Sequence, residues 1–240
     1  MIISILMNMN MNTNMAIAMT ETTNAAQLLK LMSWLSPVFP IGGFAYSAGL
    51  EQAVQSSHVS DQSSLSDWIR VQITQGAQWN DSVLLAEAHR RVGQKPELEE
   101  VTDLCLALCV GQQRLDEARG QGTSFIRAVS HWVSPAHFPD RDTPLPVAIG
   151  IAAGVDGIEL SLTAGAYLHA FVSNQLQCAI RLSVTGQDGA AKILAGLEPV
   201  VEATALRATA STLEDLGAAT FMADIASLNH ETLEPRLFLS

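Results

Sequence analysis

The stretch SPVFPIGGFAYSAGLE, residues 36–51, decides how the chain around it folds. Pro37 and Pro40 end any helix that precedes them, because proline lacks an amide donor and clashes with the preceding turn. Gly42 and Gly43 then allow a tight turn, since glycine adopts positive and negative φ about equally well. A new helix can begin after them. The segment therefore predicts a helix, a rigid turn and a second helix.

Large apolar side chains crowd this turn, which we call the elbow (residues 36–51). Phe39, Phe44 and Tyr46 lie in it together with Val38 and Ile41. Loops usually run over the surface of a protein, where such side chains would contact water. An apolar loop is therefore either packed into the core or presented to a partner, and the sequence leaves both alternatives open.

The elbow resembles the signature of the UreF family of urease accessory proteins, which runs approximately S-P-x-x-P-x-G-x-[FY]-[ST]-Y-S-x-G-L-E. Ala45 departs from this pattern, because the family usually has a small hydroxyl residue there. The positions that match are Ser36, Pro37, Pro40, Gly42, Phe44, Tyr46, Ser47, Gly49, Leu50 and Glu51.

Two later segments resemble the same family, and the three segments, at about residues 30–55, 115–127 and 175–240, follow the expected order. An E-x-R-x-x-G pattern recurs in the second, and the third contains forms of R-L-x-P-L-G-Q and of the tail S-M-R-H-E-x-x-x-x-R-L-F-R-S. Val184 and Thr185 depart from the former, and Asn229 and Leu239 replace two arginines of the latter. The matching residues are Glu117, Arg119, Gly122, Arg181, Leu182, Gly186, Gln187, Ser227, His230, Glu231, Arg236, Leu237, Phe238 and Ser240.

The resemblance implies an all-α protein that is usually a homodimer and is not an enzyme. Such proteins join the accessory protein UreD, also called UreH, and recruit the GTPase UreG. Together they act on the urease apoprotein, so that nickel and a carbonate-modified lysine are installed. No catalytic, cofactor-binding or metal-binding residue is expected in this chain.

The resemblance also implies which residues meet these partners. The elbow would lie near the GTPase-facing or dimer surface, and the tail would bind UreD. The expected partner-binding residues are Pro40, Gly42, Gly43, Phe44, Tyr46, Ser47, Gly49, Glu51, Glu117, Arg119, Gly122, Arg181, Gln187, His230, Glu231, Arg236, Leu237 and Phe238.

The composition favours a protein that has part of its apolar surface covered by a partner. Apolar residues make up 48% of the 240 positions and charged residues only 15%, with a mean hydropathy of +0.21. No stretch of about 18 residues is continuously apolar, so a membrane-spanning helix is not expected. The excess indicates extra apolar surface that meets a partner, although an alanine-rich helical bundle would account for much of it.

Charge and cysteine usage limit the class of protein further. The net charge is −11, and nucleic acid binding needs basic patches that neutralise phosphates, so it is not expected. An odd number of cysteines, three, and no secretion signal indicate a reducing cytoplasm. Cys105 and Cys109 share a helical face. They are either half of a metal site or, more in keeping with their apolar neighbours, small core residues.

The chain is expected to form a single domain, an all-α bundle of about 8–10 helices over residues 25–226. Residues 1–24 are rich in Met and Asn and contain no basic residue, so we expect a disordered leader, or a start codon assigned too early. Residues 227–240 form a tail whose Leu237, Phe238 and Leu239 predict that it packs on its own body or on another protein. Burying each such side chain is worth roughly 1.5–3 kcal/mol.

Apolar residues recur at helical spacing along most of the chain. Trp79-Asn80-Asp81 is interpreted as a break in which Asn80 or Asp81 caps the next helix. Gly120 and Gly122 each cost about 1 kcal/mol relative to alanine inside a helix, so close approach of another backbone is expected there. The predicted helices cover residues 25–35, 45–57, 65–75, 82–92, 97–110, 112–133, 146–154, 159–183, 190–210, 212–217 and 220–226.

No catalytic constellation stands out. None of the six histidines pairs with another at metal-binding helical spacing. His230 beside Glu231 is either a partner or metal contact or a cap on a terminal turn. A rival hypothesis is a helical enzyme or small-ligand-binding protein with a pocket lined by Tyr46, Tyr167 and His169. A membrane-surface protein is a third hypothesis, which the scarcity of lysine disfavours.

Overall fold

The structure, a computed structural model, describes residues 25–240, and the leader expected over residues 1–24 lies outside them. Every regular element among the described residues is helical, which confirms the all-α prediction. A helix covers residues 25–34. It is followed by η1 (Gly43–Ala45), α2 (Leu50–Gln55), α3 (Gln62–Gln75), α4 (Ala77–Arg90), α5 (Lys95–Ala107), α6 (Gln112–Val129), η2 (Pro135–His137), α7 (Leu145–Val155), α8 (Leu160–Arg181), α9 (Gln187–Ala210), η3 (Leu213–Asp215) and α10 (Phe221–His230).

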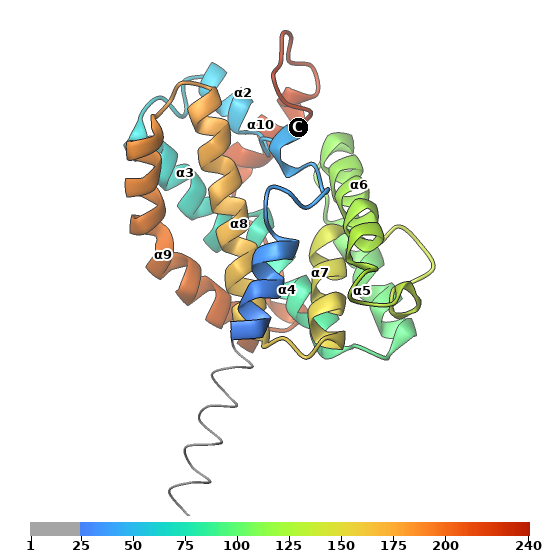
Figure 1. The fold of residues 1–240 in the computed structure, drawn as a ribbon. Helices are drawn as coiled ribbons and strands as arrows, with labels where there is room; N and C mark the ends of the chain where they lie inside the picture. Colours follow the sequence, from blue (N-terminus) through green and yellow to red (C-terminus); the bar gives the residue numbers. More distant parts are fainter. Residues whose placement is uncertain (1–24) are drawn as a thin grey trace, which may run out of the picture.

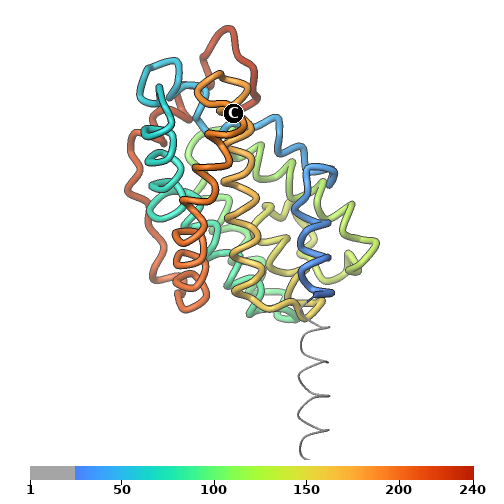
Figure 2. The backbone as a smooth tube through the Cα atoms, turned by 60° about the vertical axis from the view of Figure 1, so that its left-hand side comes forward, coloured from blue at the N-terminus to red at the C-terminus, as the bar shows by residue number. Residues whose placement is uncertain are grey.

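Helix α4 lies at the centre of the bundle. It packs against α7, α8, α9, α3 and α5, and its residues from Gln78 to Ala88 are buried. Figure 1 shows α8 and α9 on one side of α4 and α5, α6 and α7 on the other. Figure 2 shows that the helix over residues 25–34, in blue, lies on the other side of α8 from α9. The apolar core therefore runs through the middle of a single helical assembly.

Helices α4 and α7 approach each other closely because α7 carries small residues on the contacting face. A Cβ added at Gly150 would lie 2.3 Å from the Leu85 carbonyl oxygen, and one at Gly154 would lie 2.8 Å from the His89 carbonyl oxygen. The apolar side chain of Ile149, next to Gly150, is fully buried. This packing is the main contact of the core, and glycine is needed to make it.

The two glycines of α6 differ in their surroundings. A Cβ added at Gly122 would lie 1.9 Å from the Thr143 carbonyl oxygen, so the expected close approach of another backbone is confirmed there. No other atom lies within 4 Å of a Cβ added at Gly120, so the same expectation is wrong at that position. The helix also ends at Val129 rather than at residue 133.

The helix predicted over residues 45–57 is wrong in its first half. Ala48 and Gly49 both have positive φ, at 50° and 80°, and α2 begins only at Leu50. A Cβ added at Gly49 would lie 3.0 Å from the Ser227 amide nitrogen. The left-handed turn therefore lets the elbow come against the backbone of α10.

The predicted break at Trp79-Asn80-Asp81 is also wrong, because α4 runs through these residues and the interruption lies at Gly76. Asn80 Oδ1 accepts a hydrogen bond from the Gly217 amide at 2.9 Å instead of capping α4. The helix expected over residues 220–226 continues to His230 as α10. None of the helices in residues 25–240 is both long enough and apolar enough to cross a membrane.

Candidate functional site

Segments far apart in the sequence meet at one end of the molecule. Figure 1 shows the C-terminus beside the elbow and close to α10. The elbow, the first half of α6, the end of α8 and the tail all contribute side chains there. We call the buried contacts among Ser47, Glu51, Glu117, His230 and residues 237–240 the clasp.

The carboxylate of Glu51 lies at the centre of the clasp. Glu51 is in the first turn of α2 and is 6% exposed. Its Oε1 accepts a hydrogen bond from the Leu237 amide at 2.7 Å, and its Oε2 accepts one from the Phe238 amide at 3.1 Å. The Nε2 of the fully buried His230 also lies 2.9 Å from Oε2. One carboxylate thus holds both α10 and the tail, and hydrogen bonds to a charged group are stronger than neutral ones.

The last two residues of the tail bind the elbow and α6 directly. The main-chain oxygen of Ser240 accepts hydrogen bonds from the amide and the hydroxyl of Ser47, each at 2.6 Å. The Leu239 amide donates to the Ala45 carbonyl at 2.7 Å. The Ser240 hydroxyl donates to Glu117 Oε2 at 2.9 Å. The tail is therefore held by directional bonds on both of its sides.

Side chains of α8 donate hydrogen bonds to backbone carbonyls of the elbow. Asn174 donates to the Tyr46 carbonyl at 3.0 Å, and Gln175 donates to the Ser47 carbonyl at 2.9 Å. Arg181 donates to the Phe44 carbonyl at 2.8 Å, and its guanidinium lies 4.2 Å from the centre of the Phe238 ring. This cation–π contact adds attraction to the burial of Phe238, which is only 2% exposed.

Glu231 binds the N-terminus of α6. Its Oε1 accepts hydrogen bonds from the Gln112 and Gln113 amides, at 2.8 and 3.2 Å, which are the first two residues of α6. A negative charge at this end complements the partial positive charge of a helix N-terminus. The geometry differs from the expected cap on a terminal turn, because Glu231 caps the distant helix α6 and His230 binds Glu51 of α2.

A buried ion-pair group adjoins the clasp. Arg114 lies 2.6 Å from Asp81 Oδ2 and 3.5 Å from Glu117 Oε1. The Tyr167 hydroxyl donates to Asp81 at 2.9 Å. Burial raises the pKa of the Glu117 carboxyl, with Arg114 acting in the opposite direction. These charged groups pair with one another. The group therefore fixes the position of Glu117 and does not present a reactive side chain to solvent.

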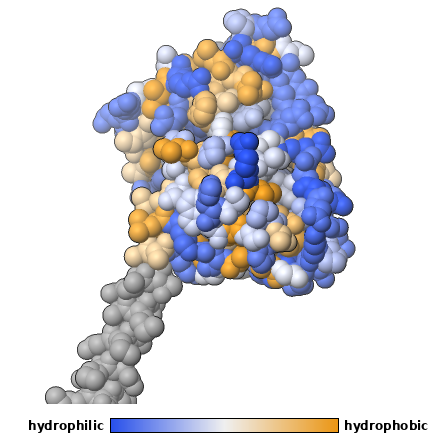
Figure 3. Space-filling view, turned by 45° about the vertical axis from the view of Figure 1, so that its right-hand side comes forward, coloured by the Kyte–Doolittle hydropathy of each residue, from blue (hydrophilic) through white to orange (hydrophobic). Residues whose placement is uncertain are grey.

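The clasp leaves three apolar side chains exposed around it. Phe44, Leu237 and Leu239 are 69%, 62% and 55% exposed. Leu237 and Leu239 flank the buried Phe238, as alternation along an extended chain requires. We call these three residues the elbow–tail patch. Figure 3 shows that apolar side chains, in orange, reach the surface at several separate places on the face turned forward in that view.

The structure separates the sequence-predicted site residues into three groups. Glycines 42 and 43 have open space around them, and Pro40, Phe44 and Arg236 are exposed. The residues that meet in or beside the clasp are Tyr46, Ser47, Gly49, Glu51, Glu117, Arg181, His230, Glu231, Leu237 and Phe238. Those whose described contacts or positions lie elsewhere are Arg119, which faces Asp142, Gly122, which lies under Thr143, and Gln187, which begins α9.

The rival pocket does not form as expected. Tyr167 is buried against Asp81, whereas His169, two positions along α8, is exposed. The two side chains therefore do not face a common cavity. Cys109 donates to the Cys105 carbonyl at 3.5 Å, and within residues 25–240 no group of three or more His, Cys, Asp and Glu residues could hold a metal ion.

Sequence reasoning missed Asp81 and Arg114, and it missed the outer face of α10. Asp81 resembled a helix cap, and no local pattern relates it to Arg114, 33 positions away. Apolar residues of α10 at helical spacing were available as a signal. Spacing alone, however, does not tell an apolar face that is buried from one that is exposed.

Comparison with known proteins identifies relatives along almost the whole chain. The family model described as UreF matches residues 59–198. A protein of Brucella anthropi named urease accessory protein UreF 1 is 47% identical, over 91% of this chain and 96% of that protein. The protein of the same name from Brucella canis is 46% identical over 93% of this chain and 100% of its own length. A UreF protein of Rhizobium etli is 46% identical over 92% of this chain and 100% of its own length.

Proposed function

Because the chain belongs to the UreF family of urease accessory proteins, which are not enzymes, we propose that it is a scaffold for maturation of the urease metal centre. In this proposal it joins UreD, also called UreH, recruits the GTPase UreG and presents both to the urease apoprotein. Nickel is the cargo of that assembly. The chain supplies binding surfaces and no reactive group.

The observation that carries the proposal is the exposed elbow–tail patch on a rigid support. Phe44, Leu237 and Leu239 expose large side chains, although their backbone is fixed by hydrogen bonds to Glu51, Ala45 and Arg181. A surface that is already ordered loses little conformational entropy when a partner binds it. Exposed apolar side chains grouped in this way mark interaction sites.

The structure changes which tail residue a partner would contact. Phe238 is inside the protein, so it holds the tail in place, and Leu237 and Leu239 are available for contact. We propose that the tail half of the patch meets UreD and that the elbow half lies near UreG or near a second copy of this chain. The same family resemblance supports a homodimer acting in the cytoplasm.

The test is co-purification of a tagged chain with UreD and UreG from the same source. The informative variant carries Leu237→Asp and Leu239→Asp, which changes the patch without removing a buried side chain. Leu206→Asp is the matched control, because Leu206 is 53% exposed on α9, away from the patch. Phe238→Asp tests the clasp separately, since a buried charge there should release the tail.

We expect a stable complex with the unmodified chain and with Leu206→Asp, and loss of UreD from the double variant. Retention of UreD by the double variant would exclude the patch as its binding surface. If the unmodified chain forms no complex while UreD and UreG are both soluble, the scaffold function itself is wrong.

A further inference from the structure

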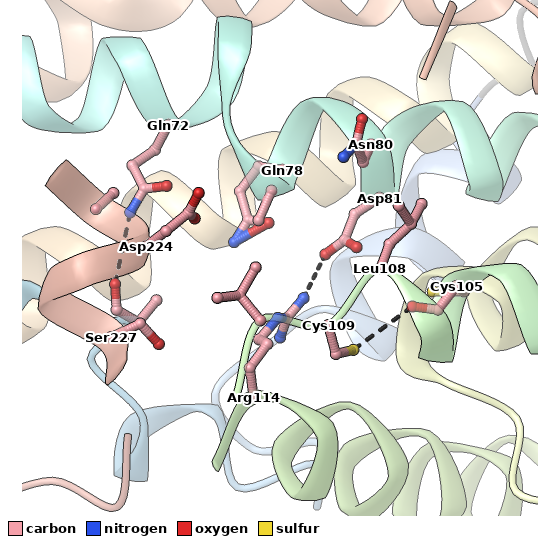
Figure 4. A pocket seen from close by; sticks show the side chains of 14 residues that line it. Gln72, Gln78, Asn80, Asp81, Cys105, Leu108, Cys109, Arg114, Asp224 and Ser227 are labelled. Atoms are coloured by element: carbon pink, nitrogen blue, oxygen red, sulfur yellow. Dashed lines mark hydrogen bonds and ion pairs between the residues drawn. The ribbon is translucent and has the colours of Figure 1, made fainter. Parts of the chain in front are cut away.

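A small cavity lies where α10, α4 and the loop between α5 and α6 meet, outside the clasp. Its volume is about 50 Å³. Figure 4 shows the amide of Gln78 and the carboxylate of Asp224 on the two sides of this space, with Arg114 beside it. Gln72, Asn80, Asp81, Cys109 and Ser227 also contribute to its polar lining. One ordered water needs roughly 10–15 Å³, so a side-chain head group of a few atoms fits.

Two acceptor groups in this cavity are not satisfied by the described part of the chain. Gln78 is only 4% exposed, and its Oε1 has no hydrogen-bond partner within residues 25–240. The partly buried carboxylate of Asp224 lines the same cavity and has no ion pair or hydrogen bond with a residue of the described chain, and burial raises its pKa. A buried polar atom without a partner is costly, and such an atom in a native protein calls for a partner outside the chain.

The other charges at the cavity are already paired. Arg114 binds Asp81 at 2.6 Å and is near Glu117 at 3.5 Å. Of the charged groups that line the cavity, Asp81 and Arg114 carry opposite charges, and Asp224 adds one further negative charge. The net potential at the cavity therefore favours a cation, which would also donate hydrogen bonds to both acceptors.

An exposed apolar surface surrounds the opening. Phe221, Ile225 and Leu228 follow one another at helical spacing along α10, and they are 74%, 48% and 45% exposed. The loop that carries Val110 lies against them, since a Cβ added at Gly111 would be 2.9 Å from Leu228 Cδ2. We call this surface the α10 face, and its members are Phe221, Met222, Ile225, Leu228, Leu108 and Val110.

The opposite side of α10 is held firmly. Ala223 and Ala226 are buried, His230 is bound to Glu51 in the clasp, and Gly49 lies against the Ser227 backbone. The α10 face is therefore presented on a fixed helix, like the elbow–tail patch, although its chemistry differs because an acceptor-lined cavity lies beside it.

We propose that the α10 face and its cavity bind a segment of another protein that inserts a lysine or arginine side chain between apolar neighbours. Arginine suits the site best, because its planar fork offers five donors to a cavity that both Gln78 and Asp224 line. The inference rests on the proposed scaffold function in that the segment would belong to a member of the urease assembly.

Two other occupants fit the chemistry less well. Residues 1–24 of this chain contain neither lysine nor arginine, so they offer no basic side chain for the cavity. A second copy could supply one, but each copy carries a net charge of −11, so it complements this acceptor-lined cavity less well than a basic protein does. A basic partner protein would donate hydrogen bonds to the acceptors in the cavity, and its positive charge would complement the net negative charge of the whole chain.

The direct test titrates the full chain with N-acetyl-argininamide and, as the uncharged match, N-acetyl-norleucinamide, and follows amide NMR signals. We expect the arginine probe to shift the side-chain amide of Gln78 and the backbone amides of α10. We expect Asp224→Asn to weaken its binding at least tenfold. Asp67→Asn, an exposed aspartate on α3, is the control and should leave binding unchanged.

Equal binding of the two probes, or equal binding of the arginine probe to the unmodified chain and to Asp224→Asn, would overturn the proposal. A second result would also overturn it: the chain does not bind the arginine probe, and it forms a dimer that Ile225→Ser converts to a monomer. The α10 face would then join two copies of the chain.

In the complex with UreD and UreG, loss of a partner on Asp224→Asn supports the inference. A complex that forms equally well with Asp224→Asn and Ile225→Ser overturns it and leaves the scaffold function standing.

Discussion

Helix α7 and the C-terminal tail are both buried, but different forces hold them. Val147, Ile149 and Ile151 of α7 are fully buried by apolar packing, mostly against α4. The tail buries one large side chain, Phe238, and otherwise depends on hydrogen bonds to Glu51, Ser47, Ala45 and Glu117.

The difference teaches where the protein tolerates change. Apolar packing is not directional, and it is spread over many side chains, so no single contact holds α7 in place. The bonds of the tail converge on a few atoms, so one substitution can release it. Release of a chain end also leaves the rest of the bundle folded, which limits the cost to the free energy of that local opening.

The largest effect should come from overpacking the α4–α7 contact. Gly150→Leu forces a side chain against the Leu85 carbonyl, so we expect the free energy of unfolding in urea to fall by about 3 kcal/mol or more. Gly196→Leu in α9 is the control, since its Cβ meets open space, and it should be neutral or gain up to about 1 kcal/mol. Equal stability of the two variants would show that α7 does not pack on α4 in this way.

A smaller effect should follow from removing the carboxylate at the centre of the clasp. Glu51→Ala leaves two amides and His230 without their acceptor, and we expect a loss of about 2–3 kcal/mol in urea unfolding. Water reaches these groups once the tail opens, which keeps the loss below that of Gly150→Leu. The exposed Glu198→Ala is the control. An unchanged midpoint for Glu51→Ala would mean that the tail does not depend on Glu51.

Alternation along the tail predicts unequal effects at neighbouring positions. Phe238→Ala should cost about 2 kcal/mol, less than the roughly 3–5 kcal/mol of an enclosed core phenylalanine, because the tail can open. Leu239→Ala should change the free energy of unfolding by less than about 0.5 kcal/mol, since the side chain is exposed. Similar losses at both positions would contradict the orientation of the tail.

The smallest effect concerns a thiol beneath the elbow. Burial raises the pKa of Cys178 to about 12, and its Sγ donates to the Tyr46 carbonyl at 3.4 Å. At pH 8 about one thiol in ten thousand is ionised, so iodoacetamide should label Cys109 well before Cys178. Rapid labelling of Cys178 in the native protein would show that the elbow opens readily.

The same pKa predicts a pH effect with a definite sign. The folded chain holds the Cys178 proton more tightly than the unfolded chain, whose thiol has the ordinary pKa of 9.0. The contribution of Cys178 to stability is therefore complete below pH 9 and is lost as the pH rises toward 12. Cys178→Ala should remove this part of the alkaline loss of stability, as measured by urea unfolding at several pH values.

The sequence was sufficient to predict most of the helices and the close backbone contact at Gly122. Glycine inside a helix carries a cost that a close contact can explain, which is why Gly122 could be found from the sequence. The errors fell on residues whose type allows two roles. Asn80 and Asp81 are common helix caps, but here they bond to Gly217 and Arg114 from inside α4.

The site was predictable as a set of residues and not as an arrangement. The resemblance named Glu51, His230 and Phe238, but Glu51 and His230 are 179 positions apart, and no local pattern shows that they touch. The sequence left open whether the tail packs on its own body or on another protein. The structure gives a different answer for neighbouring residues of the tail. Phe238 packs on the chain's own body, while the side chains of Leu237 and Leu239 are exposed.

Hydrogen exchange of the tail amides tests the central claim most directly, that the clasp fixes the tail and so orders the elbow–tail patch. In the unmodified chain, the amides of Leu237, Phe238 and Leu239 should be protected, and Glu51→Gln should remove the protection at Leu237 and Phe238 while amides of α7 stay protected. Tail amides that exchange freely in the unmodified chain would contradict the account, because the patch would then have no fixed support.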